Sequence, residues 1–203
     1  MLIVALALAS ALASPLDAPH EDDPTVLVGQ GMFEPAVPLP EPAIRALAQR
    51  DHSASAAALL GVDTSGLTAG QRNDIAFLKA WALIRADRAA EALSLTDAVE
   101  ASRTAPEAYR WLTIGEIHLS NGDRHSAAKA FREIDANQPI AERAALQLAA
   151  AHQQSGATKH AMEIYAELAG REDPAESGEI ALWALAQKRG LSNPTARPWL
   201  ERL

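Results

Sequence analysis

Side chains that could do chemistry are few in this chain, and its six histidines are the first to consider. His118 and His125 lie seven residues apart across an expected turn, and His152 and His160 are separated by Gly156. Neither pair has the spacing of four residues on one helix that would place two imidazoles on a metal ion, and no paired carboxylates stand nearby. The sequence holds no cysteine, so thiolate ligands, disulfides and cysteine nucleophiles are excluded. We expect no metal site.

Acid–base chemistry has one candidate, Glu116, which has no evident carboxylate partner and is expected to be a solvated charge. The sequence contains no Gly-rich phosphate loop and no Gly-x-Ser-x-Gly nucleophile elbow. The four tryptophans, at positions 81, 111, 183 and 199, fall on apolar helical faces, which favours core packing over a stacking platform. We therefore predict neither a catalytic constellation nor a cofactor site in this chain.

The elements that carry these residues repeat every 34 positions between segments 108–141 and 142–175. The recurring pairs are Gly122 and Gly156, Ala127 and Ala161, Phe131 and Tyr165, Ile134 and Leu168, and His118 and His152. A fixed period of this length is typical of stacked helix–turn–helix units, which bury their apolar faces against their neighbours. The two histidines then recur because the packing recurs. A segment with Asp87, Ala92 and Val99, offset by 35 residues, indicates a degenerate earlier repeat, and residues 175–203 indicate a later one.

Composition agrees with closely packed helices. Apolar residues make up 48% of the chain but aromatic residues only 4%, and alanine fills much of the difference. The net charge is −8, and residues 14–42 hold six of the acidic side chains and no lysine or arginine. No basic stripe stands against this acidity, so nucleic acid is not an expected partner.

Residues 1–13 are uncharged and almost wholly apolar, and they are too short to span a bilayer. Ala11 and Ala13 form a small-residue cleavage pattern before Ser14, which predicts a secretory signal peptide. No lysine or arginine precedes the apolar run, so the true start could lie upstream; the alternative is a buried N-terminal helix. Residues 14–40 are acidic and proline-rich, which predicts a poorly ordered linker. We expect a secreted protein, most simply a bacterial periplasmic one, with no membrane span after signal removal.

From residue 41 to residue 203 the pattern predicts helix after helix. Helices are expected from Pro42, around 54–60, from a capping box at Thr68 and Gln71 through Ile84, and from Asp87 through Val99. A capping box at Thr104 and Glu107 should open a helix to about residue 120, followed by helices over 124–136, about 140–155, 158–169 and 175–188. A last helix would run off the chain at Leu203, so we expect the array to be incomplete and the chain to be a fragment.

Residues 108–141 resemble the tetratricopeptide pattern, W-x2-L-G-x2-Y…G…A-x3-F…P. The signature positions hold Trp111, Ile114, Gly115, His118, Gly122, Ala127, Phe131 and Pro139, with Ile114 and His118 departing from the usual leucine and tyrosine. The second unit keeps Leu148, Ala149, Gly156, Ala161, Tyr165 and Leu168, but has Ala145 for the tryptophan and a late Pro174. The resemblance implies an all-α fold of antiparallel helix hairpins, stacked as a short right-handed solenoid.

The family's binding groove is lined by the first helix of each repeat. Carried over, the groove would present Tyr109, Leu112, Glu116, Leu119, Arg143, Leu146, Ala150 and Gln153, a mixed and mostly apolar surface. The basic set with which chaperone-binding members hold a C-terminal carboxylate is absent, since Leu112 and Glu116 stand at two of its positions. The resemblance implies a scaffold that binds protein or peptide partners non-covalently. Alternatively, some of these residues pack against a neighbouring domain.

A weaker resemblance is to the helical region that precedes the catalytic domain in some soluble lytic transglycosylases, which act on peptidoglycan. It is carried by the phrases at 76–81 and 109–116. That catalytic domain needs a Glu-Ser motif and a Gly-Leu-Met-Gln stretch; Glu176-Ser177 occurs here, but no such stretch follows it. Two alternatives to a general scaffold therefore remain: the non-catalytic arm of a lytic enzyme, and a structural subunit of a cell-envelope assembly.

Overall fold

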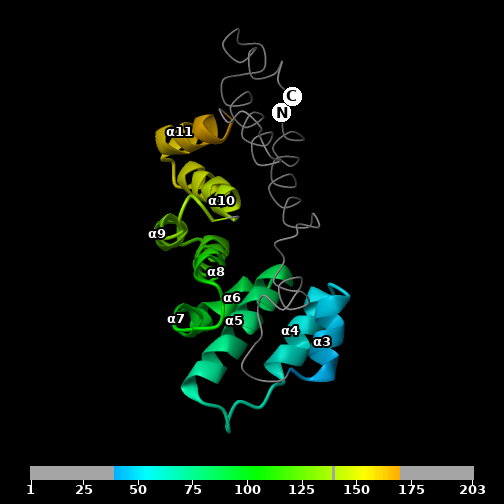
Figure 1. Ribbon diagram of the computed structural model, residues 1–203. Coiled ribbons are helices and arrows are strands. Elements are labelled where there is room, and N and C mark those ends of the chain that lie inside the picture. The colour runs from blue at the N-terminus through cyan, green and yellow to red at the C-terminus, as the bar shows by residue number, and fades with distance from the viewer. Residues whose placement is uncertain (1–38, 139, 170–203) are drawn as a thin grey trace, which may run out of the picture.

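The computed structural model describes residues 39–138 and 140–169, and every regular element in these two ranges is helical (Figure 1). The elements are α3 (Glu41–Ala48), α4 (His52–Leu60), α5 (Ala69–Arg85), α6 (Ala89–Ala92), the 3-10 turn η2 (Leu93–Leu95), α7 (Thr96–Glu100), α8 (Glu107–Ser120), α9 (Arg124–Arg132), α10 (Ala141–Gln154) and α11 (Thr158–Ala169). The predicted all-α class is confirmed for this part of the chain. The predicted signal peptide over 1–13, most of the linker over 14–40 and the helices after residue 175 lie outside the described residues.

Four short turns join the helices into hairpins, and all four share one backbone geometry. A residue with positive φ follows the first helix of each hairpin: Arg50 (54°), Asp87 (58°), Gly122 (81°) and Gly156 (82°). At Gly122, the amide of Asp123 donates to the carbonyl of His118 (2.9 Å). The amide of Gly122 itself donates to the carbonyl of Leu119 (3.0 Å). This pair of bonds is the Schellman motif, and it also closes the turns at Arg50 and Asp87.

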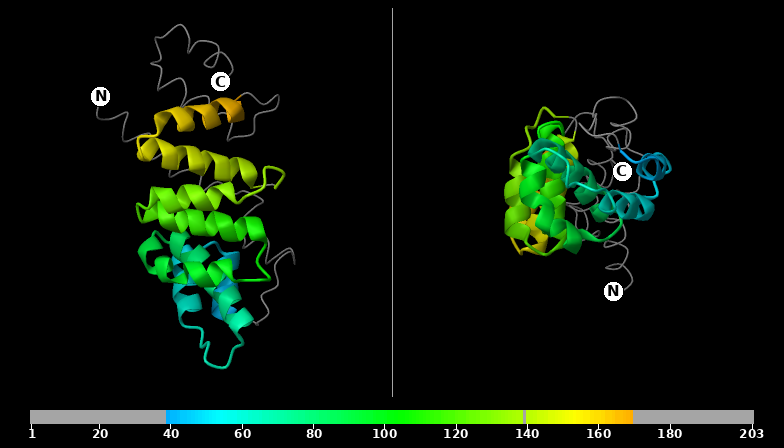
Figure 2. Two further views of the ribbon diagram at one scale, coloured as in Figure 1. Left: turned by 90° about the vertical axis from the view of Figure 1, so that its left-hand side faces the viewer. Right: turned by 90° about the horizontal axis from the view of Figure 1, so that it is seen from below.

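Successive hairpins pack against one another along the chain. The second helix of one hairpin contacts the first helix of the next, as α4 does with α5, α7 with α8, and α9 with α10. The first helices also contact each other, α5 with α8 and α8 with α10. Figure 2 shows α8, α9, α10 and α11 as consecutive rungs. A continuous core runs from Leu39 to Ala144, and a second cluster forms around Ala149, Ala161, Tyr165 and Leu168.

Within the hairpin of α8 and α9, the two helices approach closely at Gly115 of α8. A Cβ atom added there would overlap the ring of Phe131 on α9. In the following hairpin the equivalent residues are Ala149 and Tyr165, both buried. A small residue on the first helix facing an aromatic ring on the second is therefore a packing unit that both hairpins use.

Three predicted details of the helix ends differ in the structure. Asp87 is not a helix cap; its positive φ makes it the turn residue, and the helix expected over 87–99 is broken into α6, η2 and α7. Thr104 does not cap α8, which begins at Glu107 after Pro106 without a side-chain cap. Instead, Ser102 accepts the amide of Ala105 (3.3 Å), which leaves the backbone before Pro106 outside the helix. The helix predicted over 124–136 ends at Arg132.

Other boundaries agree with the sequence pattern. The Thr68–Gln71 capping box is present, with both reciprocal bonds formed at the start of α5. Leu39, assigned from the sequence to the linker, is buried in the core, so the packed region begins earlier than predicted. Among the described helices, none combines the length and the apolar character needed to cross a bilayer.

Candidate functional site

The eight residues predicted to line a groove fall into three classes of exposure. Tyr109, Leu112, Glu116 and Ala150 are buried, Leu119, Arg143 and Leu146 are partly buried, and Gln153 is exposed. Leu112 has no exposed area and belongs to the core, so it offers no surface to a partner. Glu116, expected to be a solvated charge, is only 4% exposed. That expectation was wrong, because two arginines surround the carboxylate.

The two arginines come from the helices on either side of α8. One carboxylate oxygen of Glu116 accepts from Arg85 of α5 (3.2 Å), and the other accepts from Arg143 of α10 (2.9 Å). The side chains of Arg85 and Arg143 are 7% and 20% exposed. We call these three residues the Arg–Glu–Arg cluster. It joins the first helices of three successive hairpins through side chains that are largely out of water.

The positions of the cluster follow from the register of the hairpins. Glu116 stands six residues before the left-handed turn residue Gly122, and Trp81 stands six residues before the equivalent Asp87. Trp81 and Glu116 therefore occupy matching positions on α5 and α8. Arg85 lies one helical turn after Trp81, and so falls on the same face of α5. The cluster is thus a product of the stacking rather than of any local motif.

Electrostatics keeps the Glu116 carboxylate ionised. Burial would raise the pKa of this carboxyl, but the positive charges of Arg85 and Arg143 and their hydrogen bonds outweigh the burial. The pKa of Glu116 is accordingly held below its usual value. A carboxylate in this state is a poor proton donor near neutral pH, so its surroundings favour holding the two guanidinium groups over general acid catalysis.

The indole of Trp81 packs against the Arg–Glu–Arg cluster. The guanidinium carbon of Arg85 lies 4.3 Å from the centre of the Trp81 ring, and that of Arg143 lies 6.0 Å from it. Both distances fit cation–π contacts. Trp81 is 2% exposed, as its predicted core position requires. Its Nε1–H donor, and the Nε–H donor of Arg143, are buried and have no hydrogen-bond partner among the described residues.

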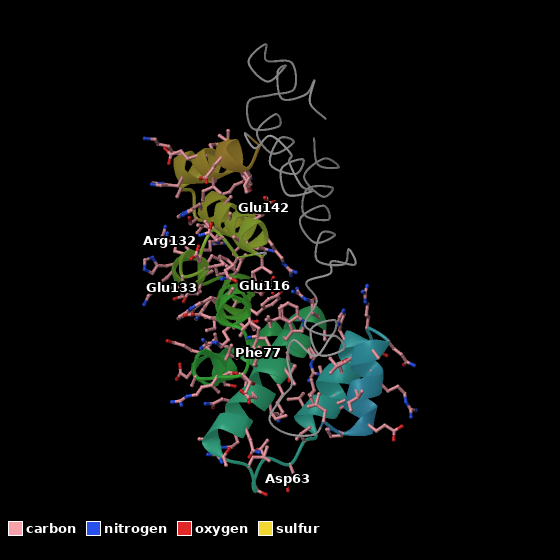
Figure 3. The ribbon with its side chains drawn as sticks, in the orientation of Figure 1. Asp63, Phe77, Glu116, Arg132, Glu133 and Glu142 are labelled. Atoms are coloured by element: carbon pink, nitrogen blue, oxygen red, sulfur yellow. The ribbon has the colours of Figure 1, made fainter. Side chains whose placement is uncertain are left out.

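The cluster and the loop after α9 point to different sides of the hairpin array. Figure 3 shows Glu116 and Glu142 on the side of α8 and α10, whereas Arg132 and Glu133 lie on the side of α9. Towards the end of α10, the hydroxyl of Tyr165 donates to Oε1 of exposed Gln153 (3.3 Å). The face formed by α5, α8 and α10, which we call the first-helix face, therefore carries a buried charged centre and an exposed amide beyond it.

The histidines do not gather into a ligand set. His118 Nδ1 lies 3.7 Å from the carboxylate of Asp123, too far for a hydrogen bond. His152 Nε2 lies 3.2 Å from Arg132, and its ring is 5.5 Å from that of His160. Burial lowers the pKa of His152, and the charges of Arg132 and His160 lower it further. Within the described residues, no three histidine or carboxylate side chains lie close enough together to hold a metal ion.

One member of the cluster and the tryptophan that packs against it were missed from the sequence as site residues. Arg85 was not singled out, and Trp81 was assigned only to core packing. The 35-residue offset between Asp87 and Gly122 was the available signal, because it aligns Trp81 with Glu116. Comparisons of the chain with protein-family models, with curated proteins and with solved structures found no match.

Proposed function

We propose that this protein is a tetratricopeptide-type scaffold that binds a protein or peptide partner on its first-helix face. The observation that carries the proposal is the Arg–Glu–Arg cluster, which ties α5, α8 and α10 into one surface. Repeat proteins of this architecture use such a surface, made of the same helix from successive units, to hold extended ligands.

Two features support the tetratricopeptide-type arrangement of the hairpins. The four turns share one left-handed position, at spacings of 35 and 34 residues among Asp87, Gly122 and Gly156. In addition, each hairpin contacts the next through both its first and second helices over α5–α11. Both features are expected of the stacked helix hairpins in a tetratricopeptide-type solenoid.

The residues that face a partner in this proposal are those of the predicted set with exposed area. They are Arg143, Leu146 and Gln153 on α10, and Leu119 on α8. Buried Tyr109, Leu112 and Ala150 support the surface from beneath. Together these residues combine an apolar strip with polar groups that can bind a peptide backbone, which suits recognition rather than catalysis.

We also propose that the scaffold acts outside the cytoplasm, after removal of residues 1–13. The support is the apolar run with its small residues at Ala11 and Ala13. N-terminal sequencing of the protein purified from its source cells should begin at Ser14. A mature protein that still begins at Met1 would contradict this part of the proposal.

Site-specific photo-crosslinking tests the binding face. A photoreactive phenylalanine analogue is placed at Gln153 of α10, and in a matched chain at Lys129, an exposed residue of α9. Irradiation in source cells should give a discrete partner band from position 153 only. The additional substitution Leu146→Glu should remove that band and leave the helical circular dichroism unchanged. Bands of equal strength from both positions would refute the proposed face.

A further inference from the structure

Every exposed side chain of α9 is basic, although the chain as a whole has a net charge of −8. The four residues are Arg124, His125, Lys129 and Arg132, and α9 contains no acidic residue. His125, Lys129 and Arg132 follow one another at spacings of four and three residues, so they lie on one side of the helix. We call the four residues the α9 basic face.

The positive charge continues from α9 to the end of α10 and the start of α11. A guanidinium nitrogen of Arg132 lies 3.2 Å from Nε2 of His152, and the ring centre of His152 lies 5.5 Å from that of His160. After burial, the charges of Arg132 and His160 are the causes of the lowered pKa of His152. The electrostatic potential at this edge of the array is therefore positive.

No carboxylate of the described residues pairs with the lysine and arginines of this face. The ion pairs within residues 39–138 and 140–169 include none of Arg124, Lys129 and Arg132. Asp123, next to α9 in the sequence, instead accepts the amide of Ser126 (3.0 Å) as the cap of the helix. An anionic partner would therefore meet exposed and unpaired cations, which attract it.

The complementary charge is present in the N-terminal part of the same chain. Residues 17–23 hold four carboxylates, and neither lysine nor arginine occurs before Arg45. These four carboxylates are Asp17, Glu21, Asp22 and Asp23. The acidic segment precedes the described part of the chain, which begins at buried Leu39.

The intervening chain is long enough to bring the acidic segment to α9. Residues 24–38 span up to about 50 Å when extended, at about 3.3 Å per residue. The path from α3 to α9 runs through α4, α5 and α8, each of which contacts the next. At about 10 Å between the axes of packed helices, the steps of this path add up to about 40 Å.

We propose that residues 17–23 dock on the α9 basic face of the same molecule, with Lys129 and Arg132 binding their carboxylates. The inference goes beyond the proposed function, because Arg132 lies on the side of α9, away from the first-helix face (Figure 3). Each exposed ion pair is weak, so docking depends on several carboxylates together and is screened by salt.

Paramagnetic relaxation enhancement in nuclear magnetic resonance locates the acidic segment. The chain has no cysteine, so Ala18→Cys carries a single nitroxide label in the ¹⁵N-labelled full chain. At low salt, the amide signals of α9 should be at least fivefold weaker with the nitroxide than with its reduced form. They should recover in 1 M NaCl, where the screening length is about 3 Å. If α3 and α4, which are nearest to the label along the chain, lost as much intensity as α9, the docking would be overturned.

Matched charge variants test the residues that bind the segment. With the same label, Lys129→Gln combined with Arg132→Gln should restore the α9 signals and leave the helical circular dichroism unchanged. Arg50→Gln combined with Arg103→Gln removes the same charge from exposed residues elsewhere and should leave the α9 signals weak. Equal recovery in the two double variants would overturn the proposal, because the attraction would then follow net charge alone.

A mixed sample distinguishes docking within one molecule from docking between two. The nitroxide is placed on unenriched chain, which is mixed with ¹⁵N-labelled chain that carries no label. The α9 signals should keep their full intensity in this mixture. A fivefold loss would place the segment of a second copy on α9 and would contradict docking within the same molecule.

Discussion

Glu116 of α8 and Arg143 of α10 stand 27 residues apart, and their side chains meet in an ion pair of 2.9 Å. The carboxylate is 4% exposed and also binds Arg85, so three successive hairpins meet at one charge. Surface ion pairs contribute little to stability because water screens them. Removing one partner of a buried ion pair is strongly destabilising, because the other partner remains buried as an uncompensated charge.

Glu116→Gln should destabilise the protein strongly, because it removes the carboxylate charge that two largely buried guanidinium groups both bind. We expect a loss of about 3–5 kcal/mol in the free energy of unfolding, measured by urea denaturation. Glu41→Gln, which breaks the exposed pair with Arg45, is the matched control and should change little. Equal changes in the free energy of unfolding for the two substitutions would show that the Glu116 carboxylate is not a buried, ion-paired charge.

The contribution of Glu116 should also depend on pH. The pKa of this carboxyl is lowered in the folded protein, so the stability that it adds is fully present above its unfolded value of 4.5. This stability should be lost as the pH falls from 4.5 through the lower folded pKa. The difference in unfolding free energy between the wild type and Glu116→Gln should therefore shrink in acid. If this difference in unfolding free energy instead grew as the pH fell, the pKa of Glu116 would not be lowered in the folded protein.

Gly115→Ala should force α8 and α9 apart, because the added methyl group would overlap the ring of Phe131. Overpacking of this kind costs about 1–3 kcal/mol, and Phe131→Leu should relieve part of it in a double-mutant cycle. Gly70→Ala, where an added Cβ atom would meet no described residue within 4 Å, is the control and should not destabilise α5. Additive effects of Gly115→Ala and Phe131→Leu would argue against the contact.

Substitutions at equivalent positions of the left-handed turns should change the stability in opposite directions, depending on whether glycine is removed or introduced. Gly122→Ala should destabilise the protein by about 1 kcal/mol, because a Cβ atom is unfavourable at positive φ. Arg50→Gly, at the exposed turn between α3 and α4, should stabilise it by about 0.5 kcal/mol, since relief of the left-handed strain exceeds the added freedom of the unfolded chain. Thermal unfolding measures both changes. The same sign for both would mean that the turns are not equivalent.

Much of the hairpin pattern was predictable because its signals are local. The glycines at 122 and 156 and the capping box at Thr68 mark turns and helix starts that the structure confirms. Arg50 and Asp87 occupy the same turn position without being glycine, so the sequence did not reveal them as left-handed residues. Thr104 had the spacing of a cap, but Ser102 takes the nearby amide of Ala105 instead.

The ion pairs of the Arg–Glu–Arg cluster could not be predicted from the sequence for a different reason. Arg85 and Arg143 stand 31 and 27 residues from Glu116, and neither spacing equals the 34-residue period. Their meeting depends on which turn of each helix faces its neighbour, which only the packing of α5, α8 and α10 determines. Glu116 therefore read as a solvated charge, although it is the most deeply buried member of an ion-pair network.

Hydrogen–deuterium exchange with the partner recovered by cross-linking, added back as purified protein, tests the binding face most directly. Backbone amides of α8 and α10 should exchange more slowly in the complex. The exchange rates of amides on the exposed sides of α9 and α11 should be the same with and without the partner. The Leu146→Glu variant should lose this protection. Protection confined to α9 and α11, with α8 and α10 unaffected, would contradict binding at the first-helix face.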